Sequence, residues 1–316
     1  MDEKHKLSKN NIENILDLTS LQEGILFHYL KDNKSNLYSV QLSIEMQGAI
    51  NIDYFKKAWS KVVDDNELLR TFFRWEKLNK PVQIILKKHN VDIRFYDLSK
   101  EENILAESEF QNIKFKDYNE GFDLADVPFR VTLCKLKDGE NNLLISNHHI
   151  IYDGWSNGII LKEFQHCYNE LVYGNLIKDN KKNSFKNYIK LNGNSSDESK
   201  SFWKDYLKGY EFKSVFSPRH FNSSQDDSHN ECYNLSIPED TFQALKHICE
   251  SQRLTIADVL YGVWGVLLSR YSGENDIIFG TTVSGINIKL DGVERMVGLF
   301  INTIPLRVNV LTGKSL

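Results

Sequence analysis

The segment that most constrains the fold is a predicted β-hairpin that runs through two histidines into a long helix. Alternating apolar residues predict strands at Phe129–Leu136 and Asn142–His148, joined by the turn-forming pair Asp138-Gly139. A few residues after His149, helical periodicity predicts a helix over about Trp155–Tyr173. A hairpin that leads this closely into a helix favours a layered α/β structure.

Helical and strand patterns alternate along the rest of the chain, which predicts mixed sheets covered by helices. Ser20 and Glu23 have the spacing of a capping box, so a helix is predicted to begin at Ser20. Asp53 is the predicted cap of a second helix, and Ser99 with Glu102 is predicted to open a third. Further helices are predicted at about 197–209, 239–251 and 256–271, and strands at about 38–46, 71–75, 82–86, 91–96, 232–237, 276–283 and 302–310.

A polar stretch separates two predicted lobes. Residues 175–200 are rich in charge, Asn and Gly, and Gly174 stands where the preceding helix should end. The sequence therefore predicts an N-terminal lobe of residues 1–174, which carries the two histidines, and a C-terminal lobe of residues 175–316.

Composition excludes several classes of protein. The chain has 39 Lys and Arg against 43 Asp and Glu, and it has no basic block, which argues against nucleic-acid binding. The longest apolar run, about Val259–Leu268, is too short to cross a bilayer, and the charged start is not a secretory signal. The four cysteines, at positions 134, 167, 232 and 249, are too far apart for zinc-site spacing and are expected to be small buried hydrophobes. We therefore expect a cytoplasmic protein that binds neither nucleic acid nor membrane.

The two histidines and the loop after them are the strongest candidate for a site. A histidine at a strand end can present a near-neutral imidazole, whose ordinary pKa of about 6.5 suits proton transfer. A glycine after Asp153 lets the backbone approach closely, and the N-terminus of the following helix offers free N–H groups to a developing oxyanion. Because neighbouring strand residues point to opposite faces, one histidine is expected to face a cleft and the other to turn inward.

Three interpretations of this loop are open on the residues alone. They are a buried pair of core histidines, a metal site built from His148, His149 and Asp153, and catalysis of acyl transfer. The strand geometry points the two histidines apart and no further ligand is signalled elsewhere, so we expect no metal. Acyl transfer is the favoured interpretation.

The loop, SNHHIIYDGWS, resembles the HHxxxDG signature of the condensation domains of nonribosomal peptide synthetases, which are relatives of chloramphenicol acetyltransferase. Segments that resemble other motifs of this family follow in the same order and span essentially the whole chain. The resemblance implies two chloramphenicol acetyltransferase-like lobes that form a V-shaped cleft. These segments are LTSLQEGILFH at 18–28, ELLRTFF at 67–73, YSGENDIIFG at 271–280 and VGLFINT at 297–303.

The resemblance also implies roles for individual residues. His149, the second histidine, is implied to be the catalytic residue. Asp153 is expected to pair with Arg70 in the interior and so hold the loop. His148 and Gly154 are expected to support the site structurally. The side chains expected to line the substrate tunnel are Tyr152, Trp155 and Asn302.

The first and second motif segments and the end of the chain add three observations. Gln22 and Glu23 are interpreted as helix-start residues. Asp65 and Asn66 stand where the family often has an Arg-His pair, which changes the local ion pairs. The family continues well beyond its VGxFxNT segment, whereas this sequence stops at Leu316, so the second lobe is expected to be incomplete.

The function implied by the resemblance is amide-bond formation in peptide antibiotic biosynthesis. A carrier-bound acyl or peptidyl thioester is the donor, and a carrier-bound aminoacyl group is the acceptor. The implied partners are the two carrier domains and an adjacent adenylation domain. No cofactor is expected to bind directly, because substrates arrive on the phosphopantetheine arms of the carriers. Two alternatives stay open: an epimerisation domain, which shares the HHxxxDG loop, and a non-catalytic docking module or inactive remnant.

Overall fold

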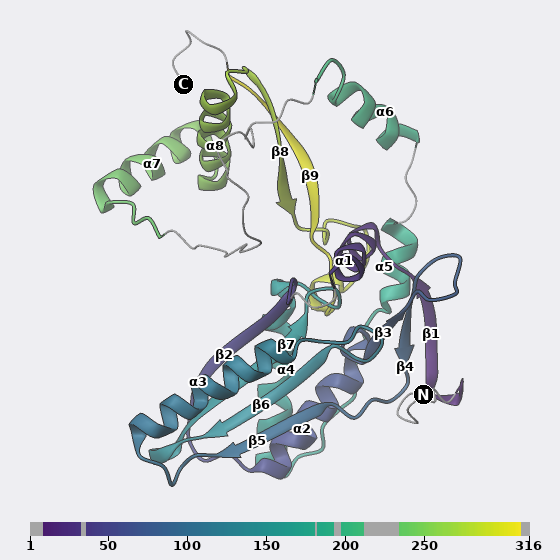
Figure 1. The fold of residues 1–316 in the computed structure, drawn as a ribbon, viewed down its shortest axis with the longest axis vertical. Helices are drawn as coiled ribbons and strands as arrows, with labels where there is room; N and C mark the ends of the chain where they lie inside the picture. The colour runs from purple at the N-terminus through teal and green to yellow at the C-terminus, as the bar shows by residue number, and fades with distance from the viewer. Residues whose placement is uncertain (1–8, 33–35, 181, 193–196, 212–233, 311–316) are drawn as a thin grey trace. The chain divides into compact units, whose positions relative to one another are not determined.

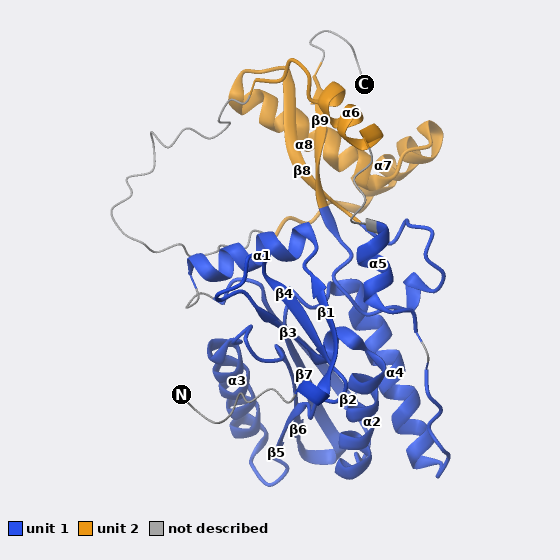
Figure 2. Ribbon diagram, turned by 90° about the vertical axis from the view of Figure 1, so that its right-hand side faces the viewer, with its two compact units in different colours: residues 1–195, 284–302 blue, residues 196–283, 303–316 orange. Residues whose placement is uncertain are grey.

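The chain divides into two compact units, coloured separately in Figure 2. The first comprises residues 1–195 and 284–302, and the second comprises residues 196–283 and 303–316. In this computed structural model, drawn in Figure 1, the residues described are 9–32, 36–180, 182–192, 197–211 and 234–310. The mixed α/β class expected from the sequence is confirmed by the element order along both units.

The larger sheet of the first unit has four strands in the order β2-β7-β6-β5. Strands β6 and β7 form the predicted hairpin, and Asp138 and Gly139 in its turn have φ angles of 55° and 78°. Only short polar residues and glycine adopt such angles readily, so the turn chemistry fixes the register of the hairpin. Strand β5 runs parallel to β6, and the other pairs are antiparallel. The strands are β2 (Ser39–Gln47), β5 (Asp92–Asp97), β6 (Phe129–Lys135) and β7 (Glu140–His148).

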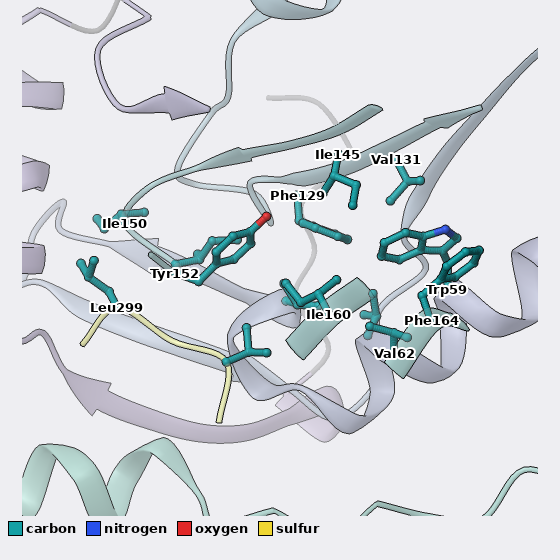
Figure 3. Packing of buried hydrophobic residues seen from close by; sticks show 14 of the residues in the cluster. Trp59, Val62, Phe129, Val131, Ile145, Ile150, Tyr152, Ile160, Phe164 and Leu299 are labelled. Atoms are coloured by element: carbon teal, nitrogen blue, oxygen red, sulfur yellow. The ribbon is translucent and has the colours of Figure 1, made fainter. Parts of the chain in front are cut away.

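Helices cover both faces of this sheet. Leu143 and Ile145 of β7 pack in the cluster formed by α2 (Ile52–Asp65) and α4 (Gly154–Val172), part of which Figure 3 shows. The residue between them, Leu144, packs against α3 (Asn103–Glu120) on the opposite face. Eight of the nine residues of β7 are buried for this reason, as expected for a strand that is covered on both sides.

A second sheet of the first unit has three antiparallel strands in the order β1-β4-β3. Strands β3 (Thr71–Arg74) and β4 (Val82–Leu86) lie where the sequence predicts them, but β1 (Ile12–Asp17) was not predicted. Only one of the six residues of β1 is buried, so the strand has no apolar alternation that could signal it. It is followed directly by α1 (Ser20–Lys31).

The polar stretch after Gly174 contains a helix that the sequence analysis missed. Helix α5 (Phe185–Asn192) buries Phe185 and Tyr188, which stack with ring centroids 5.4 Å apart. Phe300, from the returning segment 284–302, packs on Tyr188 at 4.8 Å. Phe185, Tyr188 and Ile189 have the i, i+3, i+4 spacing of a helix, but this short apolar face stands within a polar stretch; its packing attaches the stretch to the first unit. The first unit therefore extends beyond the lobe boundary that the sequence places at Gly174.

In the second unit, Arg307 joins the C-terminal strand to two other elements. Its guanidinium bonds Asp276 with Nη2 2.6 Å from Oδ2, and its Nη1 lies 2.6 Å from the carbonyl oxygen of Tyr206.

The strand predicted at 232–237 is wrong at residues 234–237, which are not a strand in the structure. Its first two residues lie outside the described part. The elements of this unit are α6 (Asp197–Tyr206), α7 (Glu239–Gln252), α8 (Ile256–Ser272), β8 (Asp276–Val283) and β9 (Asn302–Asn309), the last beginning at the unit boundary.

Helix α1 begins at Ser20 as predicted, but the capping residues predicted for three helices differ from those in the structure. Helix α1 is capped by Thr19 and not Ser20: the Thr19 hydroxyl accepts from the Gln22 amide nitrogen, and the Gln22 side chain accepts from that of Thr19. Helix α2 is capped by Asn51 and not Asp53, because Asn51 Oδ1 accepts from two amides of the first turn. Helix α3 begins only after Glu102, and the Ser99 hydroxyl bonds Asp97. Capping residues occur in clusters in this chain, so composition alone does not select among them.

The cysteines that the structure describes, at positions 134, 167 and 249, are buried thiols, and Cys232 lies outside the described residues. Burial raises the pKa of the Cys134 thiol to about 12, which keeps it protonated and unreactive.

Within the described part of the chain, no helix combines the length and apolar character that a bilayer span requires.

The buried carboxylate of Asp117 in α3 allows a test of which interactions stabilise the four-stranded sheet. This buried carboxylate accepts from Arg130 Nε at 2.6 Å, Gln41 Nε2 at 2.7 Å and Ser146 Oγ at 2.5 Å. Asp117→Ala removes the buried partner of Arg130 and leaves its charge paired only with the half-exposed Glu120 at 3.2 Å, so we expect a loss of about 3 kcal/mol in the free energy of urea unfolding. Lys135→Ala, which breaks an exposed pair with Asp97, should cost about 1 kcal/mol or less. Equal midpoints for the two variants would contradict this account.

Candidate functional site

The two histidines stand where β7 ends and a five-residue loop, His149–Asp153, leads into α4. The His149 amide donates to the Tyr38 carbonyl at 2.8 Å, and the Ile151 amide donates to the His148 carbonyl at 3.2 Å. The side chains of Ile150 and Ile151 are fully buried in the core. The loop is therefore anchored through both backbone and side chains.

The two imidazoles differ in environment. His148 is 2% exposed, and its Nδ1 accepts from the Ile150 amide at 3.3 Å. Burial lowers the pKa of His148 to about 4, and a positive charge on neighbouring His149 lowers it as well. His149 is partly exposed, and its Nδ1 is buried with no hydrogen-bond partner in the described residues. One ring is thus held uncharged in the interior beside another that is partly exposed.

The Asp153 carboxylate joins this loop to the returning segment 284–302. Its Oδ1 accepts from the amide of Trp155 at 3.2 Å, which makes it the N-cap of α4. Its Oδ2 accepts from the amides of Phe300 at 2.9 Å and Ile301 at 3.1 Å. The Asp153 amide donates to the Gly298 carbonyl at 3.2 Å. A buried carboxylate is therefore compensated by backbone N–H groups.

Ser156 makes a second attachment that the sequence analysis missed. Its hydroxyl donates to the Gly298 carbonyl at 3.2 Å and accepts from the Gly298 amide at 3.1 Å. A Cβ at position 298 would lie 2.9 Å from ring atoms of both Phe185 and Phe300, so this close approach requires glycine. The sequence signal for this contact is Gly298 in the VGLFINT segment, but the sequence does not indicate that Ser156 is its partner.

The predicted pair of Asp153 with Arg70 is wrong. The Arg70 guanidinium is buried, where its Nη1 forms an ion pair with Glu13 of β1 and donates to the Leu86 carbonyl of β4. Arg70 ends a 3₁₀ turn that leads into β3, so its side chain lies over this three-stranded sheet. Glu13 stands on β1, a strand that the sequence does not signal, so the sequence does not indicate it as the partner of Arg70.

Two expectations about the start of α4 are also wrong. The amides of Trp155 and Ser156 are not free for an oxyanion, because the Asp153 side chain and carbonyl accept from them. Gly154 does not sit in tight backbone geometry, because an added Cβ would meet no atom within 4 Å. Gly154, Trp155, Gly158 and Ile159 instead line a mostly apolar hollow of about 620 Å³ beside the helix.

The residues expected to line a tunnel lie in different surroundings. Tyr152 is 2% exposed, packs near Phe129 in the core of Figure 3, and its hydroxyl has no partner in the described residues. Burial raises the pKa of Tyr152 far above its ordinary value. Trp155 is 62% exposed on α4, and Asn302 is exposed at the start of β9. Tyr152 therefore faces the interior, whereas the other two are accessible.

Gln22 is more than the helix-start residue that the sequence suggested. Its side chain is fully buried, and its Nε2 donates to the carbonyl of Ile150, one residue beyond His149, at 3.1 Å. Glu23, its neighbour, is exposed. The capping box of α1 signals Gln22 as a local bond acceptor, but nothing local signals the contact with the histidine loop.

The loop does not assemble a metal site with its neighbours. Throughout the ranges that the structure describes, no group of three or more His, Cys, Asp or Glu side chains is placed to hold a metal ion. The geometry instead provides one accessible imidazole on a rigid loop, which suits proton transfer or the orientation of a substrate amine.

Comparison with known sequences identifies relatives of the chain. The sequence profile of the family described as Condensation domain matches residues 12–316. The chain is 33% identical to surfactin synthase subunit 2 of Bacillus subtilis (strain 168) over 306 residues, which cover 96% of the chain and 8% of that protein. It is 33% identical to bacitracin synthase 1 of Bacillus licheniformis over 314 residues, or 99% of the chain and 6% of that protein. The chain thus spans less than a tenth of these two relatives.

Solved structures share the fold. The first condensation domain of the calcium-dependent antibiotic synthetase, in complex with a substrate analogue, superposes with a TM-score of 0.72 at 18% identity, over 96% of this chain and 71% of that one. The starter condensation domain of rhizomide synthetase gives a TM-score of 0.74 at 18% identity, over 95% and 68%. The fold class expected from the sequence is confirmed by this similarity.

The Asp153 contacts predict a large loss of stability on truncation. Asp153→Ala leaves the buried amide of Phe300 and the partly buried amide of Ile301 without their acceptor and removes the N-cap of α4, so we expect the free energy of unfolding to fall by about 3–5 kcal/mol. Asp53→Ala is a matched control, because this exposed residue of α2 makes no cap bond in the structure and should cost about 0.5 kcal/mol or less. Denaturant unfolding measures both. A loss of less than about 1 kcal/mol for Asp153→Ala would contradict the assigned bonds.

The burial of His148 predicts how stability depends on pH. The unfolded chain protonates this residue near pH 6.5, whereas the folded protein resists protonation until about pH 4. The unfolded state therefore binds more protons in this window, and His148 should remove about 3 kcal/mol of stability as the pH falls through it. The difference in unfolding free energy between wild type and His148→Gln, measured from pH 7 to pH 4, should change by this amount in favour of the variant. A constant difference would show that His148 is not held uncharged.

Proposed function

The chain belongs to the condensation domain family, and on this premise we propose that it forms an amide bond between two carrier-bound substrates. The donor is an acyl or peptidyl thioester on the phosphopantetheine arm of one carrier domain. The acceptor is an aminoacyl thioester on a second carrier. The observation that carries the proposal is the unequal pair of histidines at the end of β7, one buried and uncharged and the other accessible.

In the proposed reaction the α-amine of the acceptor attacks the carbonyl carbon of the donor thioester. A C–N bond forms, the C–S bond breaks, and the proton lost by the amine ends on the released thiol of the donor carrier. His149 is the catalytic residue, and its Nε2 orients the amine or accepts its proton, since Nδ1 is buried. Such a group contributes about 10²–10⁴-fold in rate, and the juxtaposition of the two thioesters supplies much of the rest.

The neighbouring residues have supporting roles in this proposal. His148 stays uncharged through burial, so no fixed positive charge beside His149 opposes uptake of a proton. Asp153 fixes the end of the loop, and Arg70 ties together the strands of the smaller sheet. Trp155 and Gly154 border the apolar hollow beside α4, which has room for part of an extended thioester arm.

The cellular context of this reaction is part of the proposal. The relatives are named as synthases of surfactin and bacitracin, and each is many times longer than this chain. This supports a role for the chain as one catalytic domain beside carrier domains and an adenylation domain. We place the reaction in the cytoplasm, with no cofactor held by the chain itself and the phosphopantetheine arms supplied by the carriers. Asn302, exposed at the start of β9, is a candidate for contact with the substrates.

The test is dipeptide formation by the complete gene product. A donor carrier and an acceptor carrier are loaded in turn with a panel of aminoacyl groups, and the dipeptidyl thioester on the acceptor carrier is quantified by mass spectrometry. His149→Ala should lower the rate by about 10²-fold or more with an unchanged thermal midpoint. His247→Ala, an exposed histidine of the second unit, should leave the rate unchanged.

Two outcomes would overturn the proposal. Exchange of the α-proton for deuterium on a single loaded carrier, without dipeptide formation, would indicate an epimerisation domain. No product from any pair in the panel, with a correctly folded protein, would indicate a docking module or inactive remnant.

A further inference from the structure

The side-chain amide of Gln22 has every hydrogen-bonding position filled in the interior of the first unit. Its Oε1 accepts from the Thr19 amide at 2.9 Å and from Gln83 Nε2 at 3.0 Å. Its Nε2 donates to Gln83 Oε1 at 3.2 Å and to the Ile150 carbonyl at 3.1 Å. An amide can make four such bonds, and Gln22 makes all four with no exposed surface.

The other ends of these bonds belong to rigid elements. Gln83 is fully buried in the central strand β4, and its Nε2 also donates to the Asp17 carbonyl at the end of β1 at 2.9 Å. Thr19 is the N-cap of α1. Gln22 is therefore fixed by β1, β4 and the first turn of α1, and three of its four bonds lie outside the histidine loop.

The fourth bond reaches the peptide unit that follows His149 and Ile150. Its carbonyl is held by Gln22, and its N–H, that of Ile151, donates to the His148 carbonyl. Both polar groups of this peptide plane are thus restrained. Rotation of this plane would change ψ of Ile150 and φ of Ile151, and so would displace the loop backbone next to His149.

We propose that Gln22 is a positioning residue for His149, which transmits the rigidity of the β1-β4 framework to the histidine loop through the Ile150 carbonyl. The proposal rests on the proposed function for its kinetic consequence. Gln22 touches neither substrate nor imidazole, and it acts only through the loop backbone. The proposal predicts that loss of the bond from Gln22 to the Ile150 carbonyl changes kcat more than it changes KM.

The main test compares Gln22→Met with a matched control, Asn141→Leu. Met has nearly the shape of Gln but cannot donate to the Ile150 carbonyl. Asn141 is also a buried amide, and its Nδ2 donates to the carbonyls of Gly48 and Gly139 at 2.9 and 3.0 Å. It lies on β7 seven residues before His148, about 23 Å along the strand, so its loss should affect stability alone.

We expect Gln22→Met to lower kcat for dipeptide formation by about tenfold to hundredfold in the complete gene product, with KM changed by less than about threefold. Asn141→Leu should lower the thermal midpoint about as much as Gln22→Met does, and it should leave kcat of the folded protein unchanged. Equal kcat for the two variants would overturn the proposal. If Gln22→Met does not fold, Gln22→Asn, which keeps an amide one methylene short of Ile150, takes its place.

A measurement without substrate separates this proposal from the proposed function. The Cε1–H resonance of His149 in ¹³C-labelled protein, assigned with His149→Ala, reports the surroundings of the ring. Gln22→Met should shift and broaden this resonance, whereas Asn141→Leu should leave it in place. An unmoved His149 resonance in Gln22→Met refutes the positioning role even if the wild type forms dipeptide. A moved resonance with an inactive wild type refutes only the proposed function.

Discussion

The first unit depends on one buried carboxylate whose partners come from distant parts of the chain. Asp153 accepts from the first turn of its own helix and from two amides almost 150 residues later, so a single side chain both begins α4 and closes the unit. Backbone amides compensate the charge here, and no cationic side chain among the described residues forms an ion pair with it. This arrangement holds the carboxylate in one orientation, because each oxygen has its own donors. Because Asp153 is the last residue of the histidine loop, these bonds also fix the C-terminal end of the loop.

The two adjacent imidazoles differ because β7 ends between them. His148 is the last residue of the covered strand and is 2% exposed, whereas His149 is the first residue of the turn that follows and is partly exposed. Desolvation lowers the pKa of the buried ring to about 4. The chain thus obtains one buried, neutral imidazole and one accessible imidazole from the same residue type at adjacent positions.

Those parts of the fold with strong local signals could be predicted from the sequence. The Asp138-Gly139 turn, the strands on either side and the helix after Asp153 each depend on neighbours in the chain, and all are found in place. Strand β1 was missed because only one of its residues is buried and its apolar residues do not alternate, and helix α5 because its apolar face of Phe185, Tyr188 and Ile189 spans little more than one turn within a polar stretch. The wrong partner for Arg70 follows from the missed strand β1, because β1 supplies Glu13, the acidic side chain that pairs with the buried guanidinium. Ser156 and Gln22 were underestimated for a related reason: their decisive contacts are with residues 142 and 128 positions away.

The return of residues 284–302 to the first unit has a consequence for biosynthesis. A ribosome that adds about 5–20 residues per second needs roughly 7–30 s to pass from Asp153 to Phe300, which are 147 residues apart. Throughout that interval the nascent chain already contains the histidine loop and the three-stranded sheet but lacks the segment that satisfies the Asp153 carboxylate. Residues 196–283 of the second unit must leave the ribosome before the first unit can be completed. The order of synthesis therefore differs from the order in which the units can finish folding, and the Asp153 carboxylate lacks its partners from Phe300 and Ile301 until the segment 284–302 has emerged.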